Sequence, residues 1–264
     1  MDLNLENRRV LVTGSTGGIG AGIAQRFAEE GAIVVINGRR AQAAEEVAAS
    51  IREAGGKAII ALGDLSIDEG VDAVLEKIAA EVGGIDILVN NAADGGHQNS
   101  LETPVDAWMN SYNSNVLSMV RLIQKILPAM QEQGWGRIIN ISSGAATKPA
   151  PGMEVYNATK AAVSNLTVSL AHGLSGDNVT INTVSPGVIF TPGTGEYFIE
   201  HGMAADMDEA RAAMNGMAGG DVPFDRAGEV DEIAYVVVFL ASPLASYIHG
   251  ANIRVDGGYV PTVN

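Results

Sequence analysis

The chain has 264 residues, which suits one large domain or two small ones, and 47% of them are hydrophobic, enough for a substantial core. A net charge of -15, with no basic cluster larger than Arg39-Arg40, argues against nucleic acid as a partner. The absence of cysteine excludes disulfides, thiolate zinc sites and cysteine nucleophiles. The start of the chain lacks an apolar signal core, and the longest strongly apolar run, Ile233 to Ala241, is too short to span a bilayer. We therefore expect a cytoplasmic protein with no membrane partner.

A glycine-rich turn follows the first predicted strand. Val10 to Val12 is a short apolar run, and the turn Thr13-Gly14-Ser15-Thr16-Gly17-Gly18-Ile19-Gly20 comes directly after it. An alanine-rich helical pattern then extends to Gly31, and Ile33 to Ile36 reads as a second buried strand. In such a βαβ unit, glycines let backbone N–H groups and a helix N-terminus approach a pyrophosphate. Because tight turns use glycine in any case, it is the position between strand and helix that favours dinucleotide binding.

Strand and helix patterns continue to alternate along the chain. Further strands are predicted at Ala58 to Leu62, Ile85 to Val89, Arg137 to Ile141, Val179 to Val184 and Asn252 to Val255. Helices are predicted over residues 41–54, 71–82, 104–133 and 229–241, and around Tyr156 and Lys160. This alternation predicts an α/β fold: a single domain over residues 1–264, with a doubly wound parallel sheet of about seven strands and helices on both faces.

Polar clusters follow several of the predicted strands. Besides the glycine turn, they are Asp64, Asn90-Asn91, Ser142-Ser143 and Ser185 to Gly187. Open parallel sheets bind ligands beyond the carboxyl ends of their strands, so we expect these clusters to meet at one edge of the sheet.

Tyr156 and Lys160 are four residues apart on a predicted helix and project from the same face. A nearby ammonium favours the phenolate and lowers the pKa of a phenol from about 10. Such a pair could give or take a proton at a carbinol oxygen. Alone the spacing proves little, because an amphipathic Tyr beside a solvated Lys has the same pattern.

Together these motifs resemble the short-chain dehydrogenase/reductase (SDR) family over essentially the full length. The T-G-x-x-x-G-x-G loop is present at Thr13 to Gly20, the N-N-A-G element at Asn90 to Ala93, Y-x-x-x-K at Tyr156 and Lys160, and P-G-x-x-x-T at Pro186 to Thr191. The one departure is Ala93 in place of glycine, near the expected backbone path beside the nicotinamide. The resemblance implies a Rossmann-type fold.

The resemblance also implies four catalytic residues. Tyr156 would be the general acid in reduction and the base in oxidation, and Lys160 would lower its pKa and hold the nicotinamide ribose hydroxyls. Ser143 would hydrogen-bond the substrate oxygen, and Asn115 would hold a water in a proton relay behind Lys160. Taken singly, Ser143 could simply end a strand, and Asn115 could be a polar residue bonded to backbone inside a helix.

The cofactor implied is NADP(H) in preference to NAD(H). The position where NAD-binding members carry an acidic residue is Gly38, and Arg39 follows it, where an arginine accommodates the 2′-phosphate. Against this, Gly17 stands where many NADP-binding members carry a basic residue, and Arg39 could instead lie over the adenine. Asp64 would bond the adenine amino group or, alternatively, cap the next helix. The full set of expected cofactor contacts is Gly14, Thr16, Gly18, Ile19, Gly20, Arg39, Asp64, Leu65, Asn91, Ala92, Tyr156, Lys160, Pro186, Gly187, Ile189 and Thr191.

The segment from about residue 191 to 221 is predicted to be a mobile substrate lid, because it is rich in glycine and methionine and carries Tyr197. Its side chains could alternatively only pack it onto the body. Substrate contacts are expected from Ser143, Tyr156, Glu154, His97 and Tyr197. The four histidines are scattered, so no metal site is predicted.

These features predict an oxidoreductase that interconverts a secondary alcohol and a ketone by hydride transfer, on a small and mostly apolar molecule. A 3-oxoacyl-[acyl-carrier-protein] reductase-like activity is the alternative, disfavoured because an acidic surface repels an acidic carrier protein. A regulatory or non-redox dinucleotide-binding protein on the same fold is a further alternative. The resemblance implies a homo-oligomer, a tetramer or dimer, with interfaces on the helices after Pro104 and Met153.

Overall fold

Seven parallel strands form the central sheet of the computed structural model, which describes residues 2–95, 102–174, 176 and 178–263. Their order is β3-β2-β1-β4-β5-β6-β9. The strands are β1 (Arg9–Val12), β2 (Ile33–Ile36), β3 (Lys57–Ile60), β4 (Ile87–Asn90), β5 (Gly136–Ile141), β6 (Val179–Pro186) and β9 (Asn252–Val255). Two short strands, β7 (Ile189–Phe190) and β8 (Gly228–Glu229), pair separately. The predicted sheet is confirmed, although the third strand begins and ends one or two residues earlier than expected.

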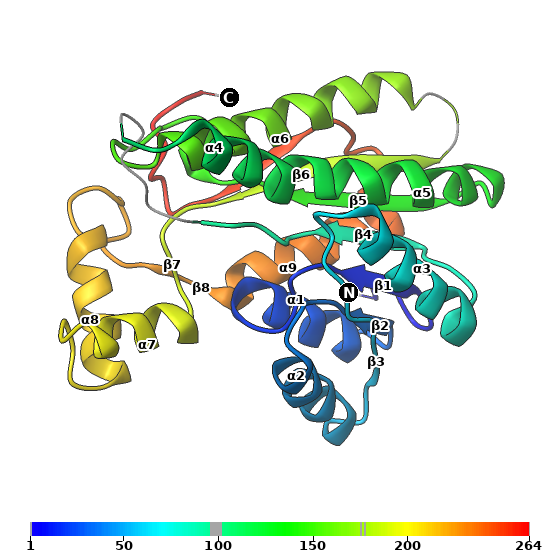
Figure 1. The fold of residues 1–264 in the computed structure, drawn as a ribbon, viewed down its shortest axis with the longest axis horizontal. Helices are drawn as coiled ribbons and strands as arrows, with labels where there is room; N and C mark the ends of the chain where they lie inside the picture. The colour runs from blue at the N-terminus through cyan, green and yellow to red at the C-terminus, as the bar shows by residue number, and fades with distance from the viewer. Residues whose placement is uncertain (1, 96–101, 175, 177, 264) are drawn as a thin grey trace.

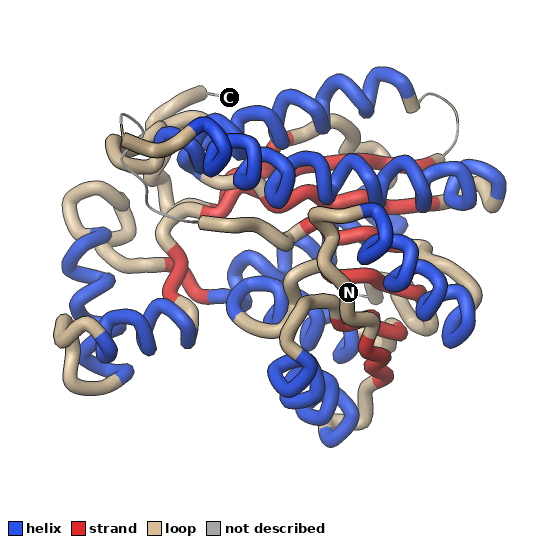
Figure 2. The backbone as a smooth tube through the Cα atoms, in the orientation of Figure 1, coloured by secondary structure: helices blue, strands red, loops and turns tan. Residues whose placement is uncertain are grey.

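Helices cover both faces of this sheet (Figures 1 and 2). They are α1 (Gly18–Glu29), α2 (Ala41–Glu53), α3 (Asp68–Val82), α4 (Val105–Tyr112), α5 (Ser118–Glu132), α6 (Glu154–Gly173), α7 (Pro192–Glu200), α8 (Met207–Ala218) and α9 (Val230–Ala241). Short turns are the π-helix η1 (Asn113–Leu117) and the 3₁₀ helices η2 (Gly144–Ala146) and η3 (Pro243–Ala245). Among the described helices none is long and apolar enough to cross a bilayer.

Alternation within each strand divides the core into two layers. Val10 and Val12 of β1 lie in the cluster formed with α1, α2 and α9, whereas Leu11 between them lies in the cluster formed with α3, α5 and α6. Successive side chains of a strand point to opposite faces, so a run that is apolar throughout must be covered on both. This explains why the predicted strands were continuous apolar runs.

The strand order reverses at β1, which pairs with β2 on one side and with β4 on the other. In a doubly wound sheet the crossover helices leave to opposite faces at this point and open a crevice beyond the carboxyl ends of the two strands. The glycine-rich turn follows β1 and the Asn90-Asn91 element closes β4. The fold therefore brings two of the predicted polar clusters to the crevice.

The predicted helix over residues 104–133 is interrupted by one π turn. α4 ends at Tyr112, η1 spans Asn113–Leu117, and α5 continues from Ser118. The expectation of one regular helix is wrong at this point, because the hydrogen bonds of a π turn skip one residue more than those of an α-helix. The turn carries Asn115, and π turns in proteins are frequently found at functional sites.

Helices α7 and α8 form a small lobe that projects from the body and is joined to it through β7 and β8 (Figure 1). The lobe has its own apolar cluster, made by Phe190, Phe198, Ala210 and Ala227. The predicted lid segment thus coincides with a separately packed unit.

Candidate active site

The glycine-rich turn after β1 packs directly on the loop after β4. Gly14 has φ of 62°, and a Cβ atom there would lie 2.9 Å from the Cα of Ala92. A Cβ on Gly20 would lie 2.5 Å from Nδ2 of Asn91. Thr13 fixes this contact, since its hydroxyl oxygen accepts hydrogen bonds from the backbone N–H groups of Asn91 and Ala92, each 2.9 Å long. These glycines are required by close approach of the two loops.

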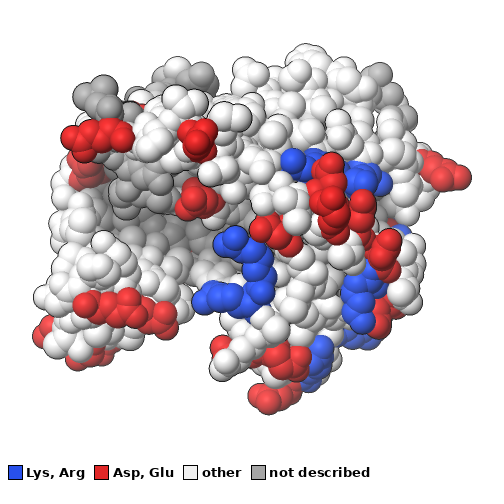
Figure 3. Space-filling view, in the orientation of Figure 1, with Lys and Arg blue, Asp and Glu red and all other residues white. Residues whose placement is uncertain are grey.

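A cleft of about 520 Å³ opens beside this contact. Its walls are Gly14, Thr16, Asn37, Gly38, Arg39, Arg40, Gly63, Asp64, Leu65, Ser66, Asn91, Ala92, Ala93, Asp94, Ser114 and Ser118. Seven of the predicted cofactor residues outside the catalytic group are among them: Gly14, Thr16, Arg39, Asp64, Leu65, Asn91 and Ala92. Figure 3 shows a hollow in this face of the molecule with a basic patch beside it, on a surface where acidic groups are otherwise frequent. The cleft is large enough for an extended dinucleotide.

The start of α1 suits a pyrophosphate. Neither a side-chain cap nor an acidic residue occupies the first turn of this helix, and a Cβ on Gly17, the residue before it, would meet no atom within 4 Å. The first backbone N–H groups of a helix lack partners within the helix and favour an anion. Gly18 and Gly20 lie in this first turn, and Ile19 between them packs partly buried against the core.

The end of the cleft beyond β2 is built by Gly38, Thr16, Arg39 and Asp64. A Cβ on Gly38 would lie 2.5 Å from Cγ2 of Thr16, so an acidic side chain at this position would displace Thr16. The Arg39 side chain is 77% exposed, and its guanidinium Nη1 lies 3.9 Å from Oδ2 of Asp64. Arg40 is the exposed residue before α2. Two arginines, Arg39 and Arg40, thus line this end of the cleft together with Asp64.

Asp64 is not a helix cap. One of its carboxylate oxygens accepts hydrogen bonds from the backbone N–H and the hydroxyl of Ser66, at 2.9 and 2.7 Å, whereas α3 begins later, at Asp68. These bonds hold the pKa of the Asp64 carboxyl below its usual value. Asp64 therefore forms a side-chain turn at the cleft wall, and Leu65 beside it lines the same wall.

Ser143, Tyr156 and Lys160 meet at the carboxyl end of β5. The Lys160 ammonium lies 5.5 Å from the centre of the Tyr156 ring and donates a 2.8 Å hydrogen bond to the carbonyl of Ile141, the last residue of β5. Ser143 hydrogen-bonds the Tyr156 side chain and caps η2 by accepting from the N–H of Ala145. The sequence prediction that these three residues lie together is supported by this geometry.

The pKa values of the pair differ from the expectation. Burial raises the pKa of the Tyr156 phenol above its usual value, and the hydrogen bond from Ser143 only partly offsets this. Burial also lowers the pKa of the Lys160 ammonium to about 8. The structure therefore does not show the net lowering of the tyrosine pKa that was expected, because burial of the phenol raises this pKa and the Lys160 ammonium is directed at the Ile141 carbonyl.

Asn115 connects three segments of the site through its side-chain amide. The amide oxygen accepts a 2.6 Å hydrogen bond from the N–H of Asp94, and the amide nitrogen donates to the carbonyl of Asp94 at 2.9 Å and to the hydroxyl of Thr159 at 3.0 Å. Thr159 in turn donates to the carbonyl of Tyr156. The alternative that Asn115 is a polar helix residue bonded to backbone therefore holds in part. Asn115 also connects the cleft wall to the helix of Tyr156 through its hydrogen bonds to Asp94 and Thr159.

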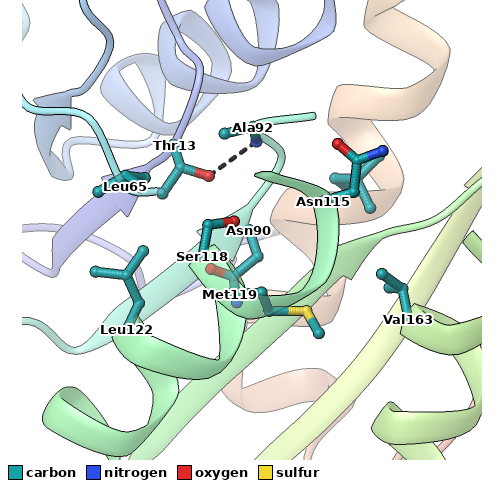
Figure 4. Close-up of a pocket in the computed structure, with 10 residues that line it drawn as sticks. Thr13, Leu65, Asn90, Ala92, Asn115, Ser118, Met119, Leu122 and Val163 are labelled. Carbon is teal, nitrogen blue, oxygen red and sulfur yellow. Dashed lines mark hydrogen bonds between the residues drawn. The ribbon is translucent and has the colours of Figure 1, made fainter. Parts of the chain in front are cut away.

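A small cavity of about 10 Å³ lies behind the cleft (Figure 4). Asn115 and Val163 lie on one side of it, and Leu65 and Leu122 on the other. Oδ1 of Asn90, buried nearby, has no hydrogen-bond partner in the described part of the chain. The volume and the polar groups among the lining residues, on Thr13, Asn90, Asn115 and Ser118, suit one water molecule.

The P-G-x-x-x-T element follows β6. A Cβ on Gly187 would lie 2.7 Å from the Cα of Asp256, so this glycine is required by the neighbouring chain after β9. Ile189 is buried in β7, and Thr191 caps α7 by accepting a hydrogen bond from the N–H of Thr194. Pro186 ends β6. These residues stand at the base of the lobe, next to the carboxyl edge of the sheet.

The remaining substrate candidates are less closely placed. Glu154 is an exposed residue in the first turn of α6 and accepts a hydrogen bond from the N–H of Gly152. Tyr197, on α7, is 51% exposed, and its ring stacks on His201 with the centres 4.0 Å apart. His97 lies outside the described residues. No group of three metal-ligating side chains occurs among the residues that the structure describes.

Two threonines of the site, Thr13 and Thr159, were given no role in the sequence analysis. Thr13 anchors the loop after β4, and Thr159 links Asn115 to the helix of Tyr156. Both belong to motifs that had been found, T-G-x-x-x-G-x-G and Y-x-x-x-K. Their roles depend on contacts between distant segments, which no local spacing shows.

A glycine-lined dinucleotide cleft beside a Ser–Tyr–Lys group defines a nicotinamide-dependent oxidoreductase. Residues 14–260 match the family model described as enoyl-(acyl carrier protein) reductase. The oxidoreductase YvrD of Bacillus subtilis is 38% identical over 98% of this chain and 99% of its own, and the 3-oxoacyl-[acyl-carrier-protein] reductase FabG of Pseudomonas aeruginosa is 35% identical over 97% and 98%. L-Sorbose reductase from Gluconobacter frateurii, solved with NADPH and L-sorbose, matches with a TM-score of 0.94 and 34% identity over the whole of both chains.

The chain belongs to the short-chain dehydrogenase/reductase family. It is an oxidoreductase that interconverts alcohols and ketones with a nicotinamide dinucleotide.

Proposed function

We propose that the protein is an NADP(H)-dependent reductase of a small, uncharged ketone, acting through Tyr156, Ser143, Lys160 and Asn115. The observation that carries this proposal is the chain of contacts between the cleft and the Tyr156 helix. Asp94 lines the cleft, Asn115 bonds Asp94 and Thr159, and Thr159 bonds the Tyr156 carbonyl. A carbonyl placed between the cleft and Tyr156 would lie within reach of both reacting partners.

The coenzyme supplies a hydride to the carbonyl carbon when it is bound. In this mechanism Ser143 hydrogen-bonds the carbonyl oxygen and Tyr156 transfers its phenolic proton to that oxygen as negative charge develops. The raised pKa of Tyr156 keeps the phenol protonated at neutral pH, which suits an acid. The Lys160 ammonium, held on the Ile141 carbonyl 5.5 Å from the centre of the Tyr156 ring, favours the phenolate that remains, although burial of the phenol has the larger effect on its pKa.

The preference for NADP(H) is proposed on the basic end of the cleft. Gly38 leaves no acidic side chain to repel a 2′-phosphate, and Arg39 and Arg40 line the cleft there. In its solved complex, L-sorbose reductase from Gluconobacter frateurii binds NADPH. Arg39 is free to turn from Asp64 toward a phosphate because the two groups are 3.9 Å apart and Arg39 is mostly exposed.

Replacing Arg39 with Leu is expected to raise the KM for NADPH about tenfold and to leave the KM for NADH within twofold. One charge-assisted contact to a phosphate is worth about 1.5–3 kcal/mol, and solvent exposure reduces it. Initial rates with each coenzyme measure both values. Arg52→Leu, which removes an exposed arginine paired with Glu45 on α2, is the control. Equal effects of Arg39→Leu on both coenzymes would contradict the proposed phosphate contact.

A small free substrate is favoured over an acyl carrier protein. The lobe above the site carries Glu196, Glu200, Asp206, Asp208 and Glu209 against the single arginine Arg211 within α7, α8 and the turn between them. Carrier proteins are acidic and would be repelled at encounter. The 35% identity to FabG keeps the carrier-linked activity as the second candidate. NADPH oxidation with small ketones, L-sorbose among them, and with a 3-oxoacyl thioester separates the two.

The lobe over residues 191–221 is proposed to act as the substrate lid. Its exposed apolar side chains, Tyr197, Met203, Met207 and Met217, could cover a substrate. Lys148, in the loop after Ser143, joins the end of the lobe to the site. Its ammonium lies 3.6 Å from a carboxylate oxygen of Asp221 and 3.8 Å from the centre of the Tyr259 ring.

Lys148→Met is therefore expected to raise the KM for the ketone about two- to fivefold without changing coenzyme affinity. The exposed ion pair and the cation–π contact are each worth up to about 1 kcal/mol. Steady-state kinetics at saturating coenzyme measure the change. Lys77→Met, which breaks an exposed pair with Glu81 on α3, is the control. Unchanged KM in Lys148→Met would argue against a lid tied at this point.

A homo-oligomer and a cytoplasmic location remain part of the proposal. Exposed apolar side chains on α4 and η1, namely Val105, Met109, Tyr112 and Leu117, and Val168 on α6 support self-association through the helices expected from the sequence. Sedimentation at micromolar concentration tests this, and a monomer would contradict it.

A further inference from the structure

The π turn η1 is held in place by two asparagine side chains that reach in different directions. A π turn is rare and less favourable than an α turn, so it persists where surrounding contacts fix it. Asn115 reaches Asp94 and Thr159, on the catalytic side. Asn113, the first residue of η1, is outside the catalytic set and reaches Ser66, in the loop before α3.

Asn113 contacts the wall of the coenzyme cleft. Its amide nitrogen donates a 2.9 Å hydrogen bond to the backbone carbonyl of Ser66. Ser66 is the residue that donates two hydrogen bonds to the Asp64 carboxylate, and both residues line the cleft. The amide of Asn113 thus fixes the turn that presents Asp64 and Leu65.

The other end of the same amide is also occupied. Its oxygen accepts a 2.9 Å hydrogen bond from Nη1 of Arg121 on α5, and Nε of Arg121 donates at 2.7 Å to Asp68, the first residue of α3. Because the oxygen faces a guanidinium and the nitrogen faces a carbonyl, the amide can bond in only one orientation. Arg121 therefore orients the donor of Asn113 toward Ser66.

We propose that Asn113 is a positioning residue that sets the distance between the Asp64–Ser66 turn and the π turn carrying Asn115. Coenzyme affinity and the placement of Asn115 then depend on one amide. This inference rests on the proposed function, because it assigns the cleft to a nicotinamide coenzyme and Asn115 to the reacting site.

Two substitutions separate the bonds made by Asn113. Asn113→Asp keeps an acceptor for Arg121 but cannot donate to Ser66, whereas Asn113→Ala loses both bonds and adds no charge. Arg121→Met removes only the other partner. Lys125→Met is the matched control, because it breaks the 2.7 Å pair between Lys125 and Asp72 across the same two helices without touching Asn113.

The dissociation constant is measured for NADPH and NADH, and the coenzyme that the wild-type protein binds more tightly is used throughout. We expect Asn113→Ala and Asn113→Asp each to weaken binding about five- to tenfold and to lower kcat at saturating substrates, as loss of one part-buried hydrogen bond would. Arg121→Met should weaken binding less, and Lys125→Met should leave it unchanged. Melting temperatures measured alongside identify any variant that is merely unstable.

The inference is overturned if both Asn113 variants bind coenzyme within twofold of wild type, or if Lys125→Met weakens binding as much as they do. It is also overturned if Asn113→Asp behaves as wild type, since the Ser66 bond would then be unnecessary. A wild-type protein that binds coenzyme but reduces no carbonyl would contradict the proposed function instead, and the binding constants would still test Asn113.

Discussion

Tyr156→Phe is expected to lower kcat for ketone reduction by about 10²–10⁴-fold, the usual contribution of a positioned acid or base, and to leave coenzyme affinity unchanged. Phenylalanine keeps the ring in its half-buried place and removes only the hydroxyl, which is the proposed proton donor and the partner of Ser143. Single-turnover reduction with saturating NADPH measures the loss directly.

The matched control is Tyr247→Phe, because Tyr247 is fully exposed, at 101% of its reference area, and makes no described contact with the site. Wild-type turnover in Tyr156→Phe would exclude the tyrosine mechanism. It would favour the alternative of a dinucleotide-binding protein whose chemistry, if any, does not use this phenol.

The pKa directions give the expected pH dependence of the wild-type protein. In the proposed mechanism, reduction needs a protonated Tyr156, whose pKa is raised by burial, and a charged Lys160, whose pKa is lowered to about 8. The profile of kcat/KM should therefore be flat at neutral pH and fall first near pH 8, as Lys160 loses its proton. Oxidation needs the phenolate and should instead increase with pH.

Much of the fold was predictable because its strands are buried on both faces and its helices repeat with a clear period. The runs at Val10 to Val12 and Ile33 to Ile36 are short and apolar throughout and lie on either side of a helical pattern, which favoured buried strands. The spacing of Tyr156 and Lys160 placed them on one helix face, since residues four apart on a helix share a face, and the other motifs of the chain gave that spacing its meaning. These properties are local in the sequence.

What the sequence did not show depends on contacts between distant segments. The π turn at residues 113–117 is fixed by Ser66, Asp94 and Thr159, which lie far from it in the chain. The direction of the Lys160 ammonium depends on the Ile141 carbonyl, and the pKa values of Lys160 and Tyr156 depend on burial. Spacing brings two side chains to one face, but it does not determine how much water reaches them.

Lys160→Met is expected to reduce turnover by at least about 100-fold and, at the same time, to make the protein more stable at pH 7. Lys160 is 3% exposed, and its ammonium has no carboxylate partner in the part of the chain that the structure describes. Lowering its pKa from 10.5 to about 8 corresponds to a cost of about 3 kcal/mol for keeping it charged in the folded state. Methionine fills a similar space without charge, although it leaves the Ile141 carbonyl unbonded, at a cost of about 1 kcal/mol.

The sign of the pH effect follows from proton binding. Between about pH 8 and pH 10.5 the unfolded chain holds a proton on Lys160 that the folded protein has released, so the stability of the wild-type protein rises with pH in this window. The advantage of Lys160→Met should therefore shrink by about 2 kcal/mol between pH 7 and pH 9.5. Urea unfolding of both proteins at the two pH values measures this difference. A variant that is less stable than wild type at pH 7, or an advantage that does not change with pH, would show that Lys160 is not a charge buried at the expense of stability.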